Sequence, residues 1–133
     1  MIGIVILLLV SQVLSDTVKV LDEKNFAKSV RRGKAFVKFF APWCGHCKRL
    51  APTWEKLAME TKSVTIAEVN CDENKKLCAT YHVVGFPTLL VFKKGKYAKY
   101  SKGRSLKELS EFIQDESEFD ALKWEEIPVI LSF

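Results

Sequence analysis

One stretch of the sequence, Phe36 to Thr53, constrains the fold more than any other. It reads F-V-K-F-F-A-P-W-C-G-H-C-K-R-L-A-P-T. Five of its first six residues are apolar, with Phe and Val predominating, and Pro42 interrupts the pattern, so we expect a buried strand that ends at Ala41. Apolar residues then recur at the spacing of a helix face: Leu50, Trp54, Leu57 and Ala58. The stretch therefore predicts that a strand, a tight connection and a helix N-terminus meet at Cys44.

Two cysteines, Cys44 and Cys47, fall in the first turn of this expected helix. The unpaired backbone N–H groups and the positive dipole end of a helix N-terminus favour the thiolate, which is the nucleophilic form of cysteine. At pH 7 a thiol with a pKa of about 8.5 is roughly 3% ionised, whereas one with a pKa of about 6 is roughly 90% ionised. We therefore predict that Cys44 is the reactive, exposed thiol and that Cys47 is buried behind it.

The eight residues Ala41 to Lys48, A-P-W-C-G-H-C-K, lie at the expected junction of strand and helix. A C-x-x-C motif alone also occurs in zinc sites, but the full string closely resembles the active site of the protein disulfide isomerase family. The resemblance extends from Val18 to Phe112 and implies an α/β thioredoxin fold, in which helices flank a central mixed sheet. It also implies a thiol–disulfide oxidoreductase without a cofactor, in which the Cys44-Gly45-His46-Cys47 motif exchanges disulfides with client proteins.

Outside this stretch, the apolar pattern predicts elements in an order that fits the resemblance. Strands are expected at 18–21, 64–70, 89–92 and 97–100, and helices shortly after Asp22, at 74–81 and at 106–114. Asp22 and Ser105 are the expected N-caps, and residues 93–96 are the expected turn of a hairpin. The alternation of strands and helices in the first part of the chain favours parallel pairing there.

Three segments are predicted along the 133 residues: a signal peptide at 1–15, a thioredoxin domain at 16–115 and a C-terminal tail of unknown structure at 116–133. The first segment is uncharged, and its apolar run is shorter than a membrane span, which needs about 20 residues. A cleaved signal is therefore favoured over an uncleaved anchor, and no stable membrane span is expected. The type of activity that the resemblance implies predicts residence in the endoplasmic reticulum lumen. Secretion is equally open, because no K-D-E-L-like retention signal ends the chain.

The formal net charge is +5, and basic residues concentrate at 93–96 and 99–107. We interpret them mainly as solvated faces, because no nucleic-acid motif and no interleaved aromatic residues accompany them. No nucleic acid is expected as a partner. The resemblance instead implies client proteins with cysteines, and glutathione or a thiol oxidase as the redox partner.

Four cysteines in a secretory chain suggest two pairs, and proximity in the sequence favours Cys44 with Cys47 and Cys71 with Cys78. The second pair falls between an expected strand end and an expected helix, where a structural disulfide is the simplest interpretation. In the chain-entropy model a loop of this length stabilises the fold by about 2.5 kcal/mol. A second redox-active pair stays open as an alternative.

Trp43, Phe86 and Pro87 are the candidates for client binding. The segment Gly85 to Thr88, G-F-P-T, matches the family's G-x-P-T segment, whose proline is cis and lies beside the cysteine pair. The exposed backbone of such a loop could hydrogen-bond an extended peptide. An ordinary turn proline and a packing tryptophan are the alternatives.

His46, Arg104 and Lys38 are the candidates for tuning the thiols. A donor or positive imidazole at His46 would stabilise the Cys44 thiolate, and Arg104 matches the family's arginine that lowers the pKa of the second cysteine. Lys38 stands where the family usually has a buried carboxylate that accepts the proton of the second cysteine. We expect Lys38 to point inward, as a partly neutral acceptor or as a cation beside Cys47. Outward, solvated side chains are the alternative for all three.

Two further classes of function compete with the enzyme. In a peptide-binding or chaperone module the cysteines are spectators, and Trp43, Phe86 and Pro87 form the contact surface. In a structural zinc module the four cysteines act with His46 and His82, although the spacing of Cys71 and Cys78 is not usual for zinc ligands. The secretory pattern favours disulfides, so we expect no metal site.

Overall fold

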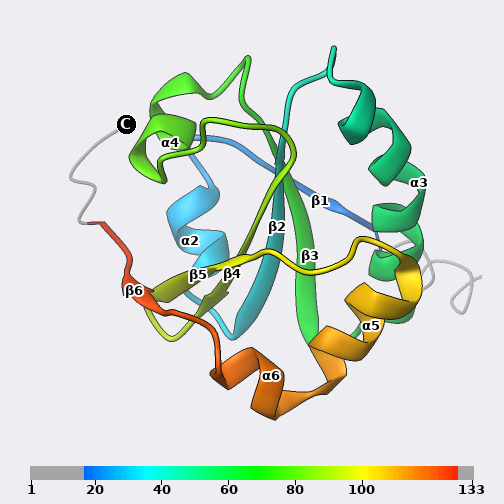
Figure 1. The fold of residues 1–133 in the computed structure, drawn as a ribbon. Coiled ribbons are helices and arrows are strands. Elements are labelled where there is room, and N and C mark those ends of the chain that lie inside the picture. Colours follow the sequence, from blue (N-terminus) through cyan, green and yellow to red (C-terminus); the bar gives the residue numbers. More distant parts are fainter. Residues whose placement is uncertain (1–16, 129–133) are drawn as a thin grey trace, which may run out of the picture.

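The strand that precedes the cysteines, β2 (Lys34–Phe40), lies at the centre of a six-stranded sheet in the order β1-β3-β2-β4-β5-β6. It pairs in parallel with β3 (Val64–Asn70) and antiparallel with β4 (Thr88–Lys93). The computed structural model describes residues 17–128 (Figure 1). The other strands are β1 (Lys19–Leu21), β5 (Lys96–Tyr100) and β6 (Glu125–Glu126). The helices are α2 (Phe26–Val30), α3 (Gly45–Glu60), α4 (Lys75–Thr80), α5 (Leu106–Gln114) and α6 (Glu116–Asp120).

Helices cover both faces of the sheet, because β2 is apolar on both sides. Alternate residues of β2, such as Val37 and Phe39, join a buried cluster with α2 and α4, whereas Phe36 joins a second cluster with α3, α5 and α6. Phe36 is fully buried, and its ring centroid lies 4.9 Å from that of Trp54 on α3. Truncating such a core phenylalanine to alanine typically costs about 3–5 kcal/mol. The C-terminal end of β2, which leads to the cysteines, is thus packed on both faces of the sheet.

The predicted elements are confirmed, with shifts of a few residues at their ends. Ser105 caps α5, since its hydroxyl accepts a hydrogen bond from the N–H of Glu108 at 3.1 Å. The prediction that Asp22 caps the first helix is wrong, because α2 follows Asn25. The Asp22 carboxylate instead accepts bonds from the N–H groups of Lys24 and Asn25 at 2.9 Å each, which stabilises the turn before the helix.

Part of the predicted tail packs against the sheet and α5. Phe119 on α6 is fully buried, and its ring stacks on that of Phe112 with centroids 5.5 Å apart. β6 then pairs antiparallel with β5 through Tyr97 and Glu125. The predicted signal peptide at 1–15 lies outside the described residues. Between residues 17 and 128, no helix is both long enough and apolar enough to cross a membrane.

Candidate active site

Cys44 ends the connection after β2 and caps α3. Its backbone is extended, with φ −80° and ψ 121°, and its carbonyl accepts the first helical bond from the N–H of Lys48 at 3.0 Å. Its own N–H donates to the carbonyl of Ala41 at 3.1 Å, which closes the connection as a turn. Its Sγ accepts a hydrogen bond from the N–H of Cys47 at 3.3 Å. The first sulfur is therefore held over the unpaired N–H groups of the helix start.

This environment separates the pKa values of the two free thiols. The pKa of Cys44 is lowered from its ordinary value of 9.0, first by a hydrogen bond with the side chain of Cys47 and then, against burial, by the backbone N–H groups of Cys47 and His46 and the charge of Arg49. The pKa of Cys47 is raised to about 11, first by burial and then by the hydrogen bond with Cys44. Cys44 is therefore the more ionised thiol and the better nucleophile.

The predicted difference in exposure between the thiols is wrong. Cys44 retains only 7% of its accessible surface and Cys47 retains 3%. Both pack in a small apolar cluster with Ala41, and the carbonyl of Phe86 lies 3.5 Å from the Cys44 Sγ. The loop that carries Phe86 covers the Cys44 sulfur, so the two thiols have similar exposure. Their pKa values, and not their exposure, distinguish them.

The backbone N–H of His46 lowers the pKa of Cys44. The prediction had assigned this effect to the imidazole ring. The ring Nδ1 lies 2.8 Å from Nη2 of Arg49, and because a guanidinium only donates, this nitrogen acts as an acceptor. The positive charge that lowers the pKa of Cys44 comes from Arg49. Arg49 was not recognised from the sequence, although it follows His46 by three residues and so lies on the same helix face. A Cβ at Gly45 would meet Arg49 Nη1 at 3.6 Å, an ordinary contact, so packing there does not demand glycine.

Lys38 points inward, as predicted, with 3% of its surface exposed. Its Nζ lies 3.7 Å from Oε1 of Glu68, which occupies the paired position on β3, and 5.0 Å from the ring centroid of Phe40. The charge of Lys38 lowers the pKa of Cys47 and so opposes the larger effect of burial. Of the two inward roles, the contact with the carboxylate of Glu68 fits a cation beside Cys47.

Glu68 was not recognised from the sequence as a site residue. It is the only carboxylate in the strand V-T-I-A-E-V-N at 64–70, and an isolated charge within an apolar strand was an available signal. Its partner could not be identified from the pattern, since the residue that faces it depends on the register between parallel strands.

The three candidate client-binding residues lie together beside the cysteines. The Phe86–Pro87 peptide bond is cis, as the resemblance implies. Trp43 is 66% exposed, and its ring meets that of Phe86 edge to face with centroids 5.8 Å apart. Arg104 lines a groove with Phe86 and Pro87, and within the described chain no hydrogen bond joins it to either thiol. Its predicted effect on Cys47 stays a prediction.

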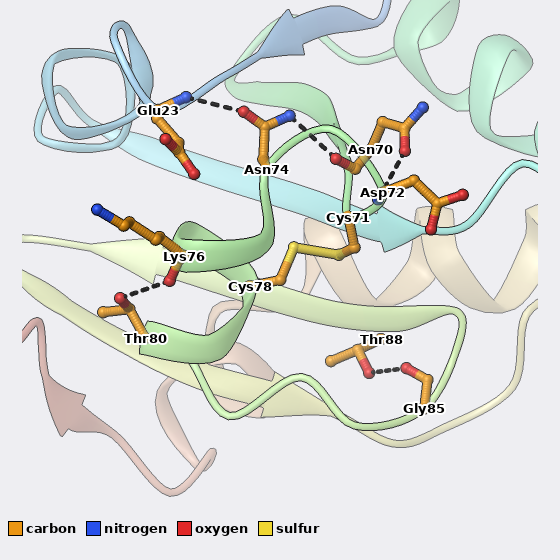
Figure 2. The surroundings of a disulfide bond; sticks show 10 residues. All are labelled: Glu23, Asn70, Cys71, Asp72, Asn74, Lys76, Cys78, Thr80, Gly85 and Thr88. Atoms are coloured by element: carbon orange, nitrogen blue, oxygen red, sulfur yellow. Dashed lines mark hydrogen bonds between the residues drawn. A yellow bond between two sulfur atoms is a disulfide. The ribbon is translucent and has the colours of Figure 1, made fainter. Parts of the chain in front are cut away.

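The other two cysteines form a disulfide with each other (Figure 2). The Cα atoms of Cys71 and Cys78 lie 5.8 Å apart, and both residues are buried. The same loop is held by Asn74, whose side chain donates to the carbonyl of Asn70 at 2.9 Å and accepts from the N–H of Glu23 at 3.0 Å. The disulfide between Cys71 and Cys78 therefore links the end of β3 to α4, within a loop that these hydrogen bonds also hold.

The disulfide also bears on the zinc alternative. It engages two of the four sulfurs that a zinc module would need as thiolates. Over residues 17–128, no group of three or more His, Cys, Asp or Glu side chains is arranged to hold a metal ion.

A mixed sheet with a dithiol at a helix start and a cis-proline loop beside it defines a thioredoxin-fold domain. The family model described as Thioredoxin matches residues 17–115. The chain belongs to the thioredoxin family.

Relatives and solved structures extend this assignment. The chain is 48% identical over 108 residues to the probable protein disulfide-isomerase A6 of Medicago sativa, covering 77% of this chain and 30% of the relative. It is 48% identical over 98 residues to the thioredoxin domain-containing protein 5 homolog of Drosophila melanogaster, covering 71% and 24%.

Among solved structures, the J-Trx1 fragment of ERdj5 superposes with a TM-score of 0.69 at 35% identity, covering 73% of this chain and 50% of the fragment. The two relatives named above are much longer than this chain, which spans about a quarter to a third of their length.

Proposed function

We propose that this chain is a thiol–disulfide oxidoreductase of the protein disulfide isomerase type. It would form, reduce or rearrange disulfides in secretory-pathway proteins through the pair Cys44 and Cys47. The observation that carries this proposal is a pair of free thiols at the start of α3, where the Cys44 Sγ caps the helix and accepts a hydrogen bond from the N–H of Cys47 at 3.3 Å. The relatives named protein disulfide-isomerase support the same class of reaction.

In the reducing direction, the Cys44 thiolate attacks one sulfur of a client disulfide. A Cys44–client disulfide forms, the client disulfide breaks, and the departing client thiolate takes up a proton. Cys47 then loses its proton and attacks the Cys44 sulfur, which releases the second client thiolate and leaves a Cys44–Cys47 disulfide. Oxidation of a client dithiol is the same sequence in reverse. Isomerisation ends when another client thiolate attacks the client sulfur of the mixed disulfide, which forms the new client disulfide and releases the Cys44 thiolate.

Cys47 must ionise during this sequence, although its pKa is raised to about 11, mainly by burial. We assign Lys38 the role of stabilising the Cys47 thiolate by its charge, with Glu68 holding the ammonium in place. The ion pair at 3.7 Å between the buried Lys38 and the partly exposed Glu68 supports this assignment, because a charge that is shielded from water acts more strongly than one in water. The partly neutral Lys38 that would accept a proton is the competing role.

Client proteins with cysteines are the proposed substrates, and glutathione or a thiol oxidase is the proposed redox partner. Trp43, Phe86 and Pro87 would contact the client beside Cys44. The uncharged, apolar segment Met1 to Ser15 supports entry into the secretory pathway, with residence in the endoplasmic reticulum lumen or secretion as the outcome. The proposed domain then begins at about residue 16, and packing of Phe119 favours including α6 in it.

Reactivation of a reduced, denatured client enzyme in a glutathione buffer tests the proposal. The wild-type chain should accelerate recovery of client activity, and the Cys44→Ser/Cys47→Ser variant should give only the rate of the buffer. Full acceleration by the double variant would contradict the proposal and favour the peptide-binding module. Circular dichroism of both proteins controls for folding.

A further inference from the structure

A groove opens beside the reactive thiol on the β5 side of the cis-proline loop. Its volume is about 710 Å³, which lies within the range of ligand sites. Phe86 and Pro87 form one wall, and the Phe86 carbonyl lies 3.5 Å from the Cys44 Sγ. The other walls come from the end of β5, the loop before α5 and the segment before β6. A client attached to Cys44 would therefore lie next to this groove.

The lining of the groove is strongly basic. Lys99, Lys102, Arg104 and Lys123 converge on it from three segments of the chain, and Glu125 is the only carboxylate in the lining. Lys102 is paired with Glu118 at 3.1 Å, outside the groove lining. Among the described residues, no carboxylate lies within 4.0 Å of the amino or guanidinium nitrogens of the other three.

The single acidic residue of the lining is already engaged. Burial, and then a hydrogen bond with Glu125, raise the pKa of Tyr97, so this carboxylate is directed at the tyrosine hydroxyl. Elsewhere on the surface, basic residues such as Lys34 and Lys93 have carboxylate partners. The three unpaired cations thus gather in one concave surface, where low-dielectric walls concentrate their field.

Two exposed apolar residues flank the groove. Val84, in its lining, is 95% exposed, and Trp43, whose ring meets that of the lining residue Phe86, is 66% exposed. An occupant that fits the whole groove therefore has an apolar residue near its cysteine and carboxylates further along. Because Lys123 lies beyond residue 115, where the match to the thioredoxin family model ends, this charge belongs to the chain's own C-terminal segment.

We propose that this groove binds an acidic segment of the client protein that flanks the reacting cysteine, so that the domain selects clients with carboxylates there. The inference rests on the proposed function, whose site the groove adjoins. Exposed ion pairs are individually weak, so we expect a preference of about tenfold for an acidic over a neutral client segment at low salt. The preference should shrink in high salt, since the Debye length falls from about 10 Å at 0.1 M to about 3 Å at 1 M.

The test uses self-quenched fluorescent peptides with an intrachain disulfide, flanked either by glutamates or by glutamines. Single-turnover reduction by the reduced domain is followed by stopped-flow. Wild type should reduce the glutamate peptide about tenfold faster at subsaturating concentration. The Lys99→Gln/Lys123→Gln variant should lose most of this preference while reducing the glutamine peptide at the wild-type rate. The matched control Lys24→Gln/Lys56→Gln removes the same net charge from exposed sites outside the groove and should keep the preference.

Equal wild-type rates on the two peptides would overturn the proposal, as would a preference that survives in the groove variant or falls equally in the control. Peptide binding to the Cys44→Ser/Cys47→Ser protein, measured by fluorescence anisotropy, tests the groove even if no peptide is reduced. In that case tighter binding of the glutamate peptide would support the groove while the oxidoreductase proposal fails. Peptide binding that is lost as the protein concentration rises would assign the groove to a second copy of the chain and so overturn the proposal.

Discussion

The two cysteine pairs of this domain differ in spacing and in the backbone around them. Cys44 and Cys47 lie at the first turn of α3, where backbone N–H groups are unpaired and the sulfurs remain free. Cys78 lies within the short helix α4, and Cys71 lies in the loop before it, and the two are bonded to each other inside a buried cluster. All four cysteines are buried, so burial does not separate the two pairs. The helix start, which stabilises a thiolate at Cys44, is what distinguishes the redox pair from the structural one.

The largest expected effect separates the roles within the free pair. Cys47→Ser should trap clients as mixed disulfides, because the Cys44 thiolate still attacks but nothing resolves the product. Cys44→Ser should trap few clients, and turnover should fall to the buffer rate in both variants. Non-reducing electrophoresis after an acid quench measures the trapped species. Equal trapping by the two variants would remove the distinction between nucleophile and resolving thiol.

Alkylation of the reduced protein should separate the same two thiols by pH. The pKa of Cys44 lies below 9.0 and that of Cys47 at about 11, so the thiolate fractions at pH 7 should differ by at least about 100-fold. Because deprotonation increases with pH, Cys44 should reach half-maximal reactivity below pH 9.0 and Cys47 only near pH 11. Iodoacetamide labelling with mass spectrometry reports each site. Coinciding profiles would contradict the separation.

Removal of the second pair should cost stability and leave the chemistry in place. Cys71→Ser/Cys78→Ser opens a link with a sequence separation of seven, which the chain-entropy model values at about 2.5 kcal/mol. Urea unfolding monitored by tryptophan fluorescence measures this loss, with client turnover recorded below the transition. A variant that stays fully stable but loses turnover would show that this pair is redox-active as well.

The next effect concerns the charge beneath Cys47. Lys38→Gln should slow release of the client from Cys44 by about tenfold, because the Cys47 thiolate loses a stabilising charge. Glu68→Gln should also slow it, since the ammonium then lacks its partner. The exchanged pair Lys38→Glu/Glu68→Lys separates the two roles of Lys38: it should stay slow if a cation is needed there and recover if a proton acceptor is needed. Stopped-flow rates at several pH values decide, and an unchanged rate in Lys38→Gln would remove Lys38 from the mechanism.

The smallest expected effect concerns His46. His46→Pro removes a backbone N–H that lowers the pKa of Cys44, so the dithiol form should be less stable and the potential should move toward reducing values. A change of about 30 mV corresponds to about 1.4 kcal/mol, against about 90 mV between thioredoxin and protein disulfide isomerase. His46→Ala keeps the N–H and should shift the potential less. Equilibration in glutathione buffers measures both, and a larger shift in His46→Ala would return the role to the imidazole.

The sequence by itself determined the elements and the position of the dithiol. The apolar run of β2, the breaker Pro42 and the helical spacing after Cys44 act locally, so they can be recognised without any distant contact. Proximity in the chain likewise identified the bond between Cys71 and Cys78. The packing of residues 116–128 was not recognised, because α6 is only five residues long and depends on burying Phe119 against the core.

Only the tertiary structure decided what surrounds the two sulfurs. The Phe86 carbonyl reaches Cys44 from 42 residues away, Glu68 faces Lys38 through the register of β2 with β3, and Lys123 joins Lys99 in one groove. Each is a contact between segments distant in the chain, and its geometry is set by strand register and helix packing, which no local pattern specifies. The reactivity of Cys44 could therefore be predicted from its position at a helix start. The contact of its sulfur with Phe86 and the charges nearby depend on the tertiary fold.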